Sequence, residues 1–186
     1  MMIDHHLEAF ASVRLDLSGG DVMSAAHARK LLTRFPLIKL INAYGPTETT
    51  VDSLWHRVTL ADLDGEIPIG QPCRGDEAFV VDDNLRPLPL GEAGQLVIAG
   101  AKVATGYHNR PDQTAFVPDP RADRGGTAYL TGDLAREEAG VFHFLGRVDR
   151  QIKLGGRRIE LDGIEHVLRD QGGCLLYTSP SPRDRG

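Results

Sequence analysis

Residues 37–50 of this 186-residue chain read LIKLINAYGPTETT: an apolar run, a glycine–proline turn, and then a group of hydroxyl and carboxyl side chains. The run over residues 37–41 predicts a strand, because a short apolar segment bounded by turn residues is typical of one. Gly45 and Pro46 supply the turn. The polar residues after the turn are therefore placed at the end of a strand.

A second strand and a helix precede this segment. Residues 13–17 alternate apolar and polar side chains, which predicts a strand that runs into a glycine turn. A helix is expected to begin after Ser24, its N-cap, and to end at Pro36, because apolar residues recur between them at helical spacing. The order strand, helix, strand predicts two parallel strands. Their carboxyl ends, at Gly19 and Asn42, lie where open α/β sheets bind ligands.

After Trp55 the sequence pattern changes, and short apolar stretches alternate with turns rich in glycine and proline. This spacing predicts a small antiparallel β-subdomain or barrel. The expected strands are 78–81, 95–99, 141–145 and 151–154, and residues 158–161 are expected to pair with the last of these.

Composition excludes several classes of protein. The 21 Lys and Arg residues against 26 Asp and Glu give a net charge of −5, which argues against electrostatic binding of nucleic acid or of an anionic membrane. No apolar run is long enough to span a bilayer, and no signal peptide opens the sequence. Cys73 and Cys174 form neither a disulfide framework nor a zinc motif. We expect a soluble cytoplasmic protein.

The residue types in segment 42–48 suit a nucleotide. The ring of Tyr44 offers a face to a flat heterocycle, and Asn42 can hydrogen-bond the edge of that ring. Thr47 can donate to a phosphate oxygen, and Glu48 is the hard oxygen ligand that Mg²⁺ prefers. A turn with polar caps also accounts for the same residues, so this segment leaves both interpretations open.

Four motifs in a fixed order carry a resemblance. Residues 42–50 resemble the adenine- and Mg²⁺-binding motif of the adenylate-forming (AMP-binding) superfamily, and their wording is most similar to that of amino-acid adenylation domains of nonribosomal peptide synthetases. Residues 94–111 resemble the glycine-rich β-barrel motif of that superfamily, residues 129–133 its Y-x-T-G-D motif, and residues 146–165 its hinge motif. Four collinear matches are a specific signal.

The resemblance implies an α/β fold made of the C-terminal part of the large adenylate-forming domain and the start of its hinged C-terminal subdomain. Residues 1–58 would hold the parallel strand–helix–strand, 59–146 the small β-barrel, and 147–172 the hinge, centred on Asp149, with the start of the C-terminal subdomain. Residues 173–186 look like the translation of a sequencing-library adaptor and are expected to play no part in the fold.

The resemblance also implies a nucleotide site. Asp133 follows a glycine, so we expect an exposed carboxylate at a turn that accepts hydrogen bonds from the ribose hydroxyls. Arg147 has the planar cationic group suited to ribose and phosphate oxygens. Phe144 would only pack, since relatives often carry Tyr at its position. The implied cofactor-binding residues are Gly20, Asp21, Asn42, Ala43, Tyr44, Gly45, Thr47, Asp133, Phe144 and Arg147. The implied catalytic residues are Thr47, Glu48 and Arg147, and Glu48 is also the implied metal ligand.

The same resemblance implies a pocket for the acyl substrate, lined by Leu17, Gly19, Ala43, Val51 and Asp52. Small residues at Gly19 and Ala43 are expected to leave volume. Asp52 either lines this pocket, which would favour a substrate that hydrogen-bonds or carries positive charge, or faces solvent.

The implied reaction joins a carboxylic acid, most simply an amino acid, to ATP with Mg²⁺, and then transfers the acyl group to the phosphopantetheine thiol of a carrier-protein domain. Transfer to coenzyme A by an acyl- or aryl-CoA ligase is the alternative, and a non-catalytic adenylate-binding fragment is a third. The phosphate loop and the final lysine of the superfamily are absent from these 186 residues, so we expect this chain to be inactive alone.

Overall fold

The computed structural model describes residues 2–110, 114–121, 124–148, 151–154, 157–161, 164 and 167–168. It divides into two units, Met1–Asp149 and Arg150–Gly186. The expected hinge residue Asp149 and the expected tail 173–186 lie outside the described residues. Within the described part, no helix is both long and apolar enough to cross a membrane.

The first sheet contains the predicted strand–helix–strand. Strands β1 (Leu15–Gly19) and β2 (Lys39–Tyr44) run parallel, with Gly19 opposite Ala43, and helix α2 (Ala25–Arg34) connects them. Ser24 caps the helix, because its hydroxyl accepts a hydrogen bond from the backbone N–H of His27 at 3.4 Å. The second strand begins two residues later than predicted, since Leu37 lies in the turn after the helix and is 93% exposed.

Two further strands extend this sheet on the other side of β2. Strand β3 (Leu54–Val58) pairs antiparallel with β2, and the short β4 (Gln71–Pro72) pairs with β3, so that the order is β1-β2-β3-β4. Strand β1 is thus one edge of the sheet. Edge strands expose backbone hydrogen-bonding groups that central strands satisfy internally.

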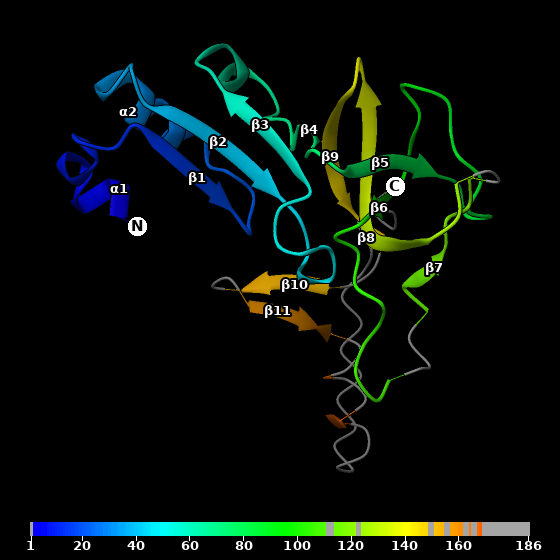
Figure 1. The fold of residues 1–186 in the computed structure, drawn as a ribbon. Coiled ribbons are helices and arrows are strands. Elements are labelled where there is room, and N and C mark those ends of the chain that lie inside the picture. The colour runs from blue at the N-terminus through cyan, green and yellow to red at the C-terminus, as the bar shows by residue number, and fades with distance from the viewer. Residues whose placement is uncertain are drawn as a thin grey trace, which may run out of the picture. The chain divides into compact units, whose positions relative to one another are not determined.

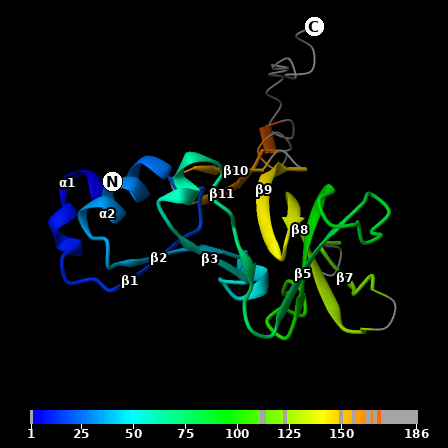
Figure 2. The same cartoon turned by 90° about the horizontal axis from the view of Figure 1, so that it is seen from above.

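One face of the first sheet is covered by helices: α1 (Met2–His5), α2, and the 3₁₀ turns η1 (Leu7–Phe10) and η3 (Ala61–Asp64). Figures 1 and 2 show α1 and α2 on the same side of β1, β2 and β3. The core between these layers consists of Phe10, Ala28, Leu31, Leu32, Ile38, Leu40, Val58 and Leu63. On the opposite face of β1, Leu15 and Leu17 are 51% and 57% exposed.

The second sheet is the predicted antiparallel subdomain. Its strands are β5 (Asp76–Val81), β6 (Ala93–Gly100), β7 (Phe116–Pro118), β8 (Thr127–Glu138) and β9 (Val141–Arg147). The order is β5-β6-β8-β7, and β9 pairs with β8. Alternate residues of β6 enter two cores, Leu96 and Ile98 in one and Val97 and Ala99 in the other. Both faces of the strand are therefore buried.

The second unit contains an antiparallel pair, β10 (Gln151–Leu154) and β11 (Arg157–Glu160), in which Gln151 lies opposite Glu160. This confirms the expected pairing of residues 151–154 with the segment that follows.

Candidate functional site

The turn after β2 folds back tightly onto the end of that strand. The N–H of Ser53 donates to the carbonyl of Tyr44 at 2.8 Å, and the turn between them contains the 3₁₀ helix η2 (Thr47–Thr49). A Cβ at Gly45 would lie 2.3 Å from the carbonyl oxygen of Val51, so only glycine fits there. The sequence therefore fixes a closed loop at the carboxyl end of β2.

This loop brings Tyr44 of the first sheet to Asp133 of the second. The Tyr44 hydroxyl donates to one oxygen of the Asp133 carboxylate, and the Arg147 guanidinium donates to the other. Arg147 lies opposite Asp133 in the β8–β9 pair. Tyr44, Asp133 and Arg147, which we call the carboxylate triad, thus join three residues that the sequence assigned separately to the nucleotide site.

The surroundings of Asp133 differ from the expectation of an exposed turn, which was wrong. Asp133 is 8% exposed and lies inside strand β8. Gly132, at φ 72°, adopts the left-handed conformation in a bulge, where the pairing with β6 shifts register. The strand continues through the bulge because Thr131 bonds both sides: its hydroxyl donates to Leu96 O at 2.8 Å and accepts from Asp133 N at 3.0 Å.

The triad uses only part of the hydrogen-bonding capacity of the Asp133 carboxylate. Burial, together with the Asp133 charge, raises the pKa of Tyr44 well above its ordinary value, so Tyr44 stays a neutral donor. A carboxylate offers about four lone-pair sites, and one on each oxygen is used by the triad. Two lone-pair sites of the Asp133 carboxylate are therefore not used by the triad.

A second carboxylate, that of Glu48, lies at the far side of the same loop. Glu48 is 9% exposed; its Oε1 accepts from the Tyr107 hydroxyl, and its backbone carbonyl accepts from Ala104 N–H at 2.8 Å. Thr47 beside it is exposed. Residues 104–107, in the segment after β6, therefore hold the loop from the other side.

The donor set around Glu48 fits a magnesium ion only in part. Among the described residues no group of three or more His, Cys, Asp or Glu side chains could hold a metal. Mg²⁺ commonly uses one or two carboxylates together with waters and substrate phosphates. Glu48 accordingly fits an ion that arrives with phosphates, and the described residues do not form a metal site of protein ligands alone.

The residues expected to line the acyl pocket lie in two places. Some are on the face of β1 and β2 opposite the helices, and the others are in the turn after β2. Leu17, Gly19 and Ala43 belong to the face, since paired residues of neighbouring strands point to the same side. Val51 is 66% exposed, and Asp52 is half-buried. The volume expected at Gly19 is absent: a Cβ there would lie 2.4 Å from the carbonyl oxygen of Ala43, because the neighbouring backbone fills that space.

Three more residues expected at the nucleotide site, Asn42, Phe144 and Asp21, lie outside the carboxylate triad. Asn42 is buried, and its amide donates to the Pro68 carbonyl at 2.8 Å, which gives it a partner within the chain. Phe144 is half-buried and packs on the core of the second sheet, in keeping with a packing role.

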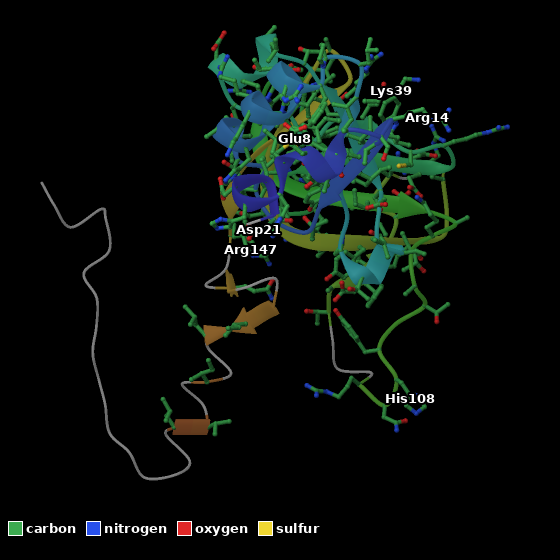
Figure 3. All side chains as sticks on the ribbon, turned by 90° about the vertical axis from the view of Figure 1, so that its left-hand side faces the viewer. Glu8, Arg14, Asp21, Lys39, His108 and Arg147 are labelled. Carbon is green, nitrogen blue, oxygen red and sulfur yellow. The ribbon has the colours of Figure 1, made fainter. Side chains whose placement is uncertain are left out.

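The third, Asp21, is exposed just beyond the carboxyl end of β1, after Gly20 at φ 87°. Figure 3 shows it at the opposite end of the strand from Arg14 and Lys39, on the side where Arg147 is labelled.

Sequence reasoning missed Tyr107 and Lys102. Tyr107 lies in a motif that the sequence singled out, but its partner Glu48 is 59 positions away, and Lys102 contacts the turn after β2 from 50 positions away. Local periodicity carries no information about such pairs.

Comparison with known proteins places the chain in a family. Residues 1–108 match the family model described as AMP-binding enzyme. Tyrocidine synthase 3 of Brevibacillus parabrevis is 42% identical over 165 residues, which are 87% of this chain and 2% of the synthase. Bacitracin synthase 1 of Bacillus licheniformis is 40% identical over 172 residues, 90% of this chain and 3% of that protein.

Solved structures agree with this result. PA1221, an NRPS protein containing adenylation and PCP domains, superposes with a TM-score of 0.83 at 37% identity, covering 91% of this chain and 35% of that one. The adenylation domain AlmE of Vibrio cholerae, in complex with glycyl-adenosine-5'-phosphate, gives 0.74 at 29% identity, covering 84% and 30%. The chain spans about a third of these structures. Because the family match covers more than half of its residues, the chain belongs to the AMP-binding enzyme family.

Proposed function

We propose that this chain contributes to an adenylation domain that activates an amino acid as acyl-AMP with ATP and Mg²⁺, for transfer to a phosphopantetheine thiol on a carrier protein. The observation that supports it most directly is the carboxylate triad, in which Tyr44 and Arg147 hold the buried Asp133 carboxylate of strand β8. The AlmE relative, solved in complex with glycyl-adenosine-5'-phosphate, supports an amino-acyl adenylate as product.

In the proposed reaction, a carboxylate oxygen of the amino acid attacks the α-phosphorus of ATP, and the bond to the leaving pyrophosphate breaks. Asp133 accepts hydrogen bonds from the ribose hydroxyls and so fixes the nucleotide. Arg147, already beside Asp133, presents positive charge to ribose and phosphate oxygens. Thr47, exposed at the loop, donates to a phosphate oxygen.

Glu48 is the residue that would hold Mg²⁺, and the ion would neutralise charge on the phosphates. The contribution of the chain is to hold this carboxylate in place: its backbone is fixed by Ala104 and its Oε1 by Tyr107. The Glu48 side chain would therefore lose little conformational entropy when it binds the ion.

The test is ATP–pyrophosphate exchange by the protein expressed from its full reading frame, assayed with panels of amino acids and of fatty acids. We expect exchange with one or a few amino acids. Asp133→Asn weakens hydrogen bonds to a charged acceptor, which contribute about 1.5–3 kcal/mol, and should lower exchange at least tenfold. Asp83→Asn, at an exposed turn residue, is the matched control and should leave exchange unchanged.

Other outcomes would contradict the proposal in separate ways. Exchange with fatty acids alone would favour an acyl-CoA ligase, for which coenzyme A is the acceptor. Absence of exchange with any acid, together with ATP binding by the same preparation, would favour a non-catalytic adenylate-binding protein.

A further inference from the structure

The turn after β2 contains two consecutive residues in an unfavourable backbone conformation. Thr50 and Val51 have φ values of 61° and 71°. Neither is glycine, and both carry a branched Cβ, which makes this left-handed conformation costly. Such a conformation persists only where neighbouring groups hold it.

One such neighbouring group is Lys102, which is hydrogen-bonded to the residue before Val51 and to the residue after it. The Thr50 hydroxyl donates to the backbone carbonyl of Lys102 at 2.8 Å. The Lys102 ammonium donates to the backbone carbonyl of Asp52 at 2.5 Å. A single residue after β6 thus fixes the residue before Val51 and the residue after it.

The position of the Lys102 ammonium is itself fixed by a buried charge. Its Nζ lies 2.5 Å from the carboxylate of Asp76, whose side chain is 1% exposed. A buried carboxylate needs a paired cation, and the ammonium that forms this ion pair also donates to the Asp52 carbonyl. Asp76, the first residue of β5, therefore fixes the position of the Lys102 ammonium.

We propose that Lys102 is a positioning residue for the acyl-substrate pocket. It touches no substrate; it holds the turn that presents Val51 and Asp52, and so determines which acid the pocket accepts. This inference rests on the proposed function for the identity of the pocket. The arrangement of the turn is independent of that function.

The direct test is hydrogen exchange in this chain. Lys102→Met keeps an unbranched stem and removes the ammonium. We expect the Asp52 and Ser53 amides, which are bonded within the turn, to exchange at least tenfold faster, with the α2 amides unchanged. Lys39→Met, at an exposed lysine of β2, is the matched control. Unchanged protection of the turn in Lys102→Met would overturn the inference whether or not the protein is an enzyme.

A second measurement separates positioning from neutralisation of Asp76. In pyrophosphate exchange by the full-length protein, Lys102→Met should raise the KM for the amino acid about tenfold and leave the KM for ATP within twofold. The double variant Asp76→Asn/Lys102→Met removes the buried charge as well, so it should regain melting temperature while its amino-acid KM stays high. Lys102→Arg should restore KM in part.

The outcomes are distinguishable from failure of the proposed function. If the double variant recovers the amino-acid KM together with stability, Lys102 serves only to pair Asp76, and the inference is wrong. If the unmodified protein shows no exchange with any acid, the proposed function fails, and hydrogen exchange alone decides whether Lys102 holds the turn.

Discussion

At the scale of single residues, two carboxylates of the site share one arrangement: each accepts a hydrogen bond from a tyrosine that lies far away in the sequence. Tyr44 donates to Asp133 across 89 positions, and Tyr107 donates to Glu48 across 59. The sequence could single out Asp133 and Glu48, because their motifs are local. It could not predict their partners or their burial, which depend on the pairing of distant strands.

Tyr44 should make the chain sensitive to alkaline pH. Its pKa is raised in the folded state, so it stays protonated while an unfolded tyrosine ionises near its ordinary pKa of 10.0. Its contribution to stability is fully present below about pH 10 and should be lost as pH rises further. In Tyr44→Phe, urea unfolding should show a shallower fall in the free energy of unfolding above pH 10. An identical pH dependence in both proteins would contradict this account.

At neutral pH the same substitution removes one hydrogen bond to a charged acceptor. We expect the free energy of unfolding of Tyr44→Phe at pH 7 to fall by about 1.5–3 kcal/mol, as measured by urea denaturation. A loss below about 0.5 kcal/mol would show that the Tyr44 hydroxyl is not bonded to Asp133 in solution.

At the scale of elements, the first sheet illustrates what sequence patterns reveal and what they miss. Hydrophobic periodicity predicted β1, α2 and β2, and the N-cap at Ser24 was correct. The reason for a glycine at position 19 could not be predicted from the sequence. A residue without a side chain suggests open volume, and only the position of the neighbouring strand shows that the space is filled. In the structure that volume is occupied by the Ala43 backbone.

Gly19→Ala should therefore disrupt the β1–β2 pair. The added Cβ would lie 2.4 Å from the Ala43 carbonyl oxygen, so the backbone must move. We expect a loss of about 1–3 kcal/mol in the free energy of unfolding, measured by urea denaturation. Gly65→Ala is the matched control, because a Cβ there would meet nothing within 4 Å. Equal effects of the two substitutions would refute the steric argument.

At the scale of the whole molecule, all apolar cores of the described residues lie in the first unit. The three clusters of buried apolar residues in the described part of the chain draw on residues 10–142, all within the first unit. The spacing of its short strands predicted that the second sheet would be a small antiparallel β-subdomain. Its bulge at Gly132 was not predicted, because a glycine followed by aspartate is also typical of a simple turn.

A chain ending at residue 149 should consequently fold as the 186-residue chain does. It keeps the three clusters and the carboxylate triad. We expect its melting temperature, measured by calorimetry, to lie within about 2 °C of that of the 186-residue chain, since both would lose the same described cores on heating. A broad or much lower transition would show that residues after 149 stabilise the first unit.

The Tyr44–Asp133 hydrogen bond crosses from the first sheet to the second. A nucleotide that hydrogen-bonds to Asp133 would therefore bind where the two sheets meet, a contact that we call the seam. Its binding would be linked thermodynamically to the free energy that holds the two sheets together. Under mechanical load, the force needed to separate the sheets should rise with nucleotide concentration. The same linkage would make nucleotide affinity fall in variants that loosen the seam, even when every residue that touches the ligand is intact.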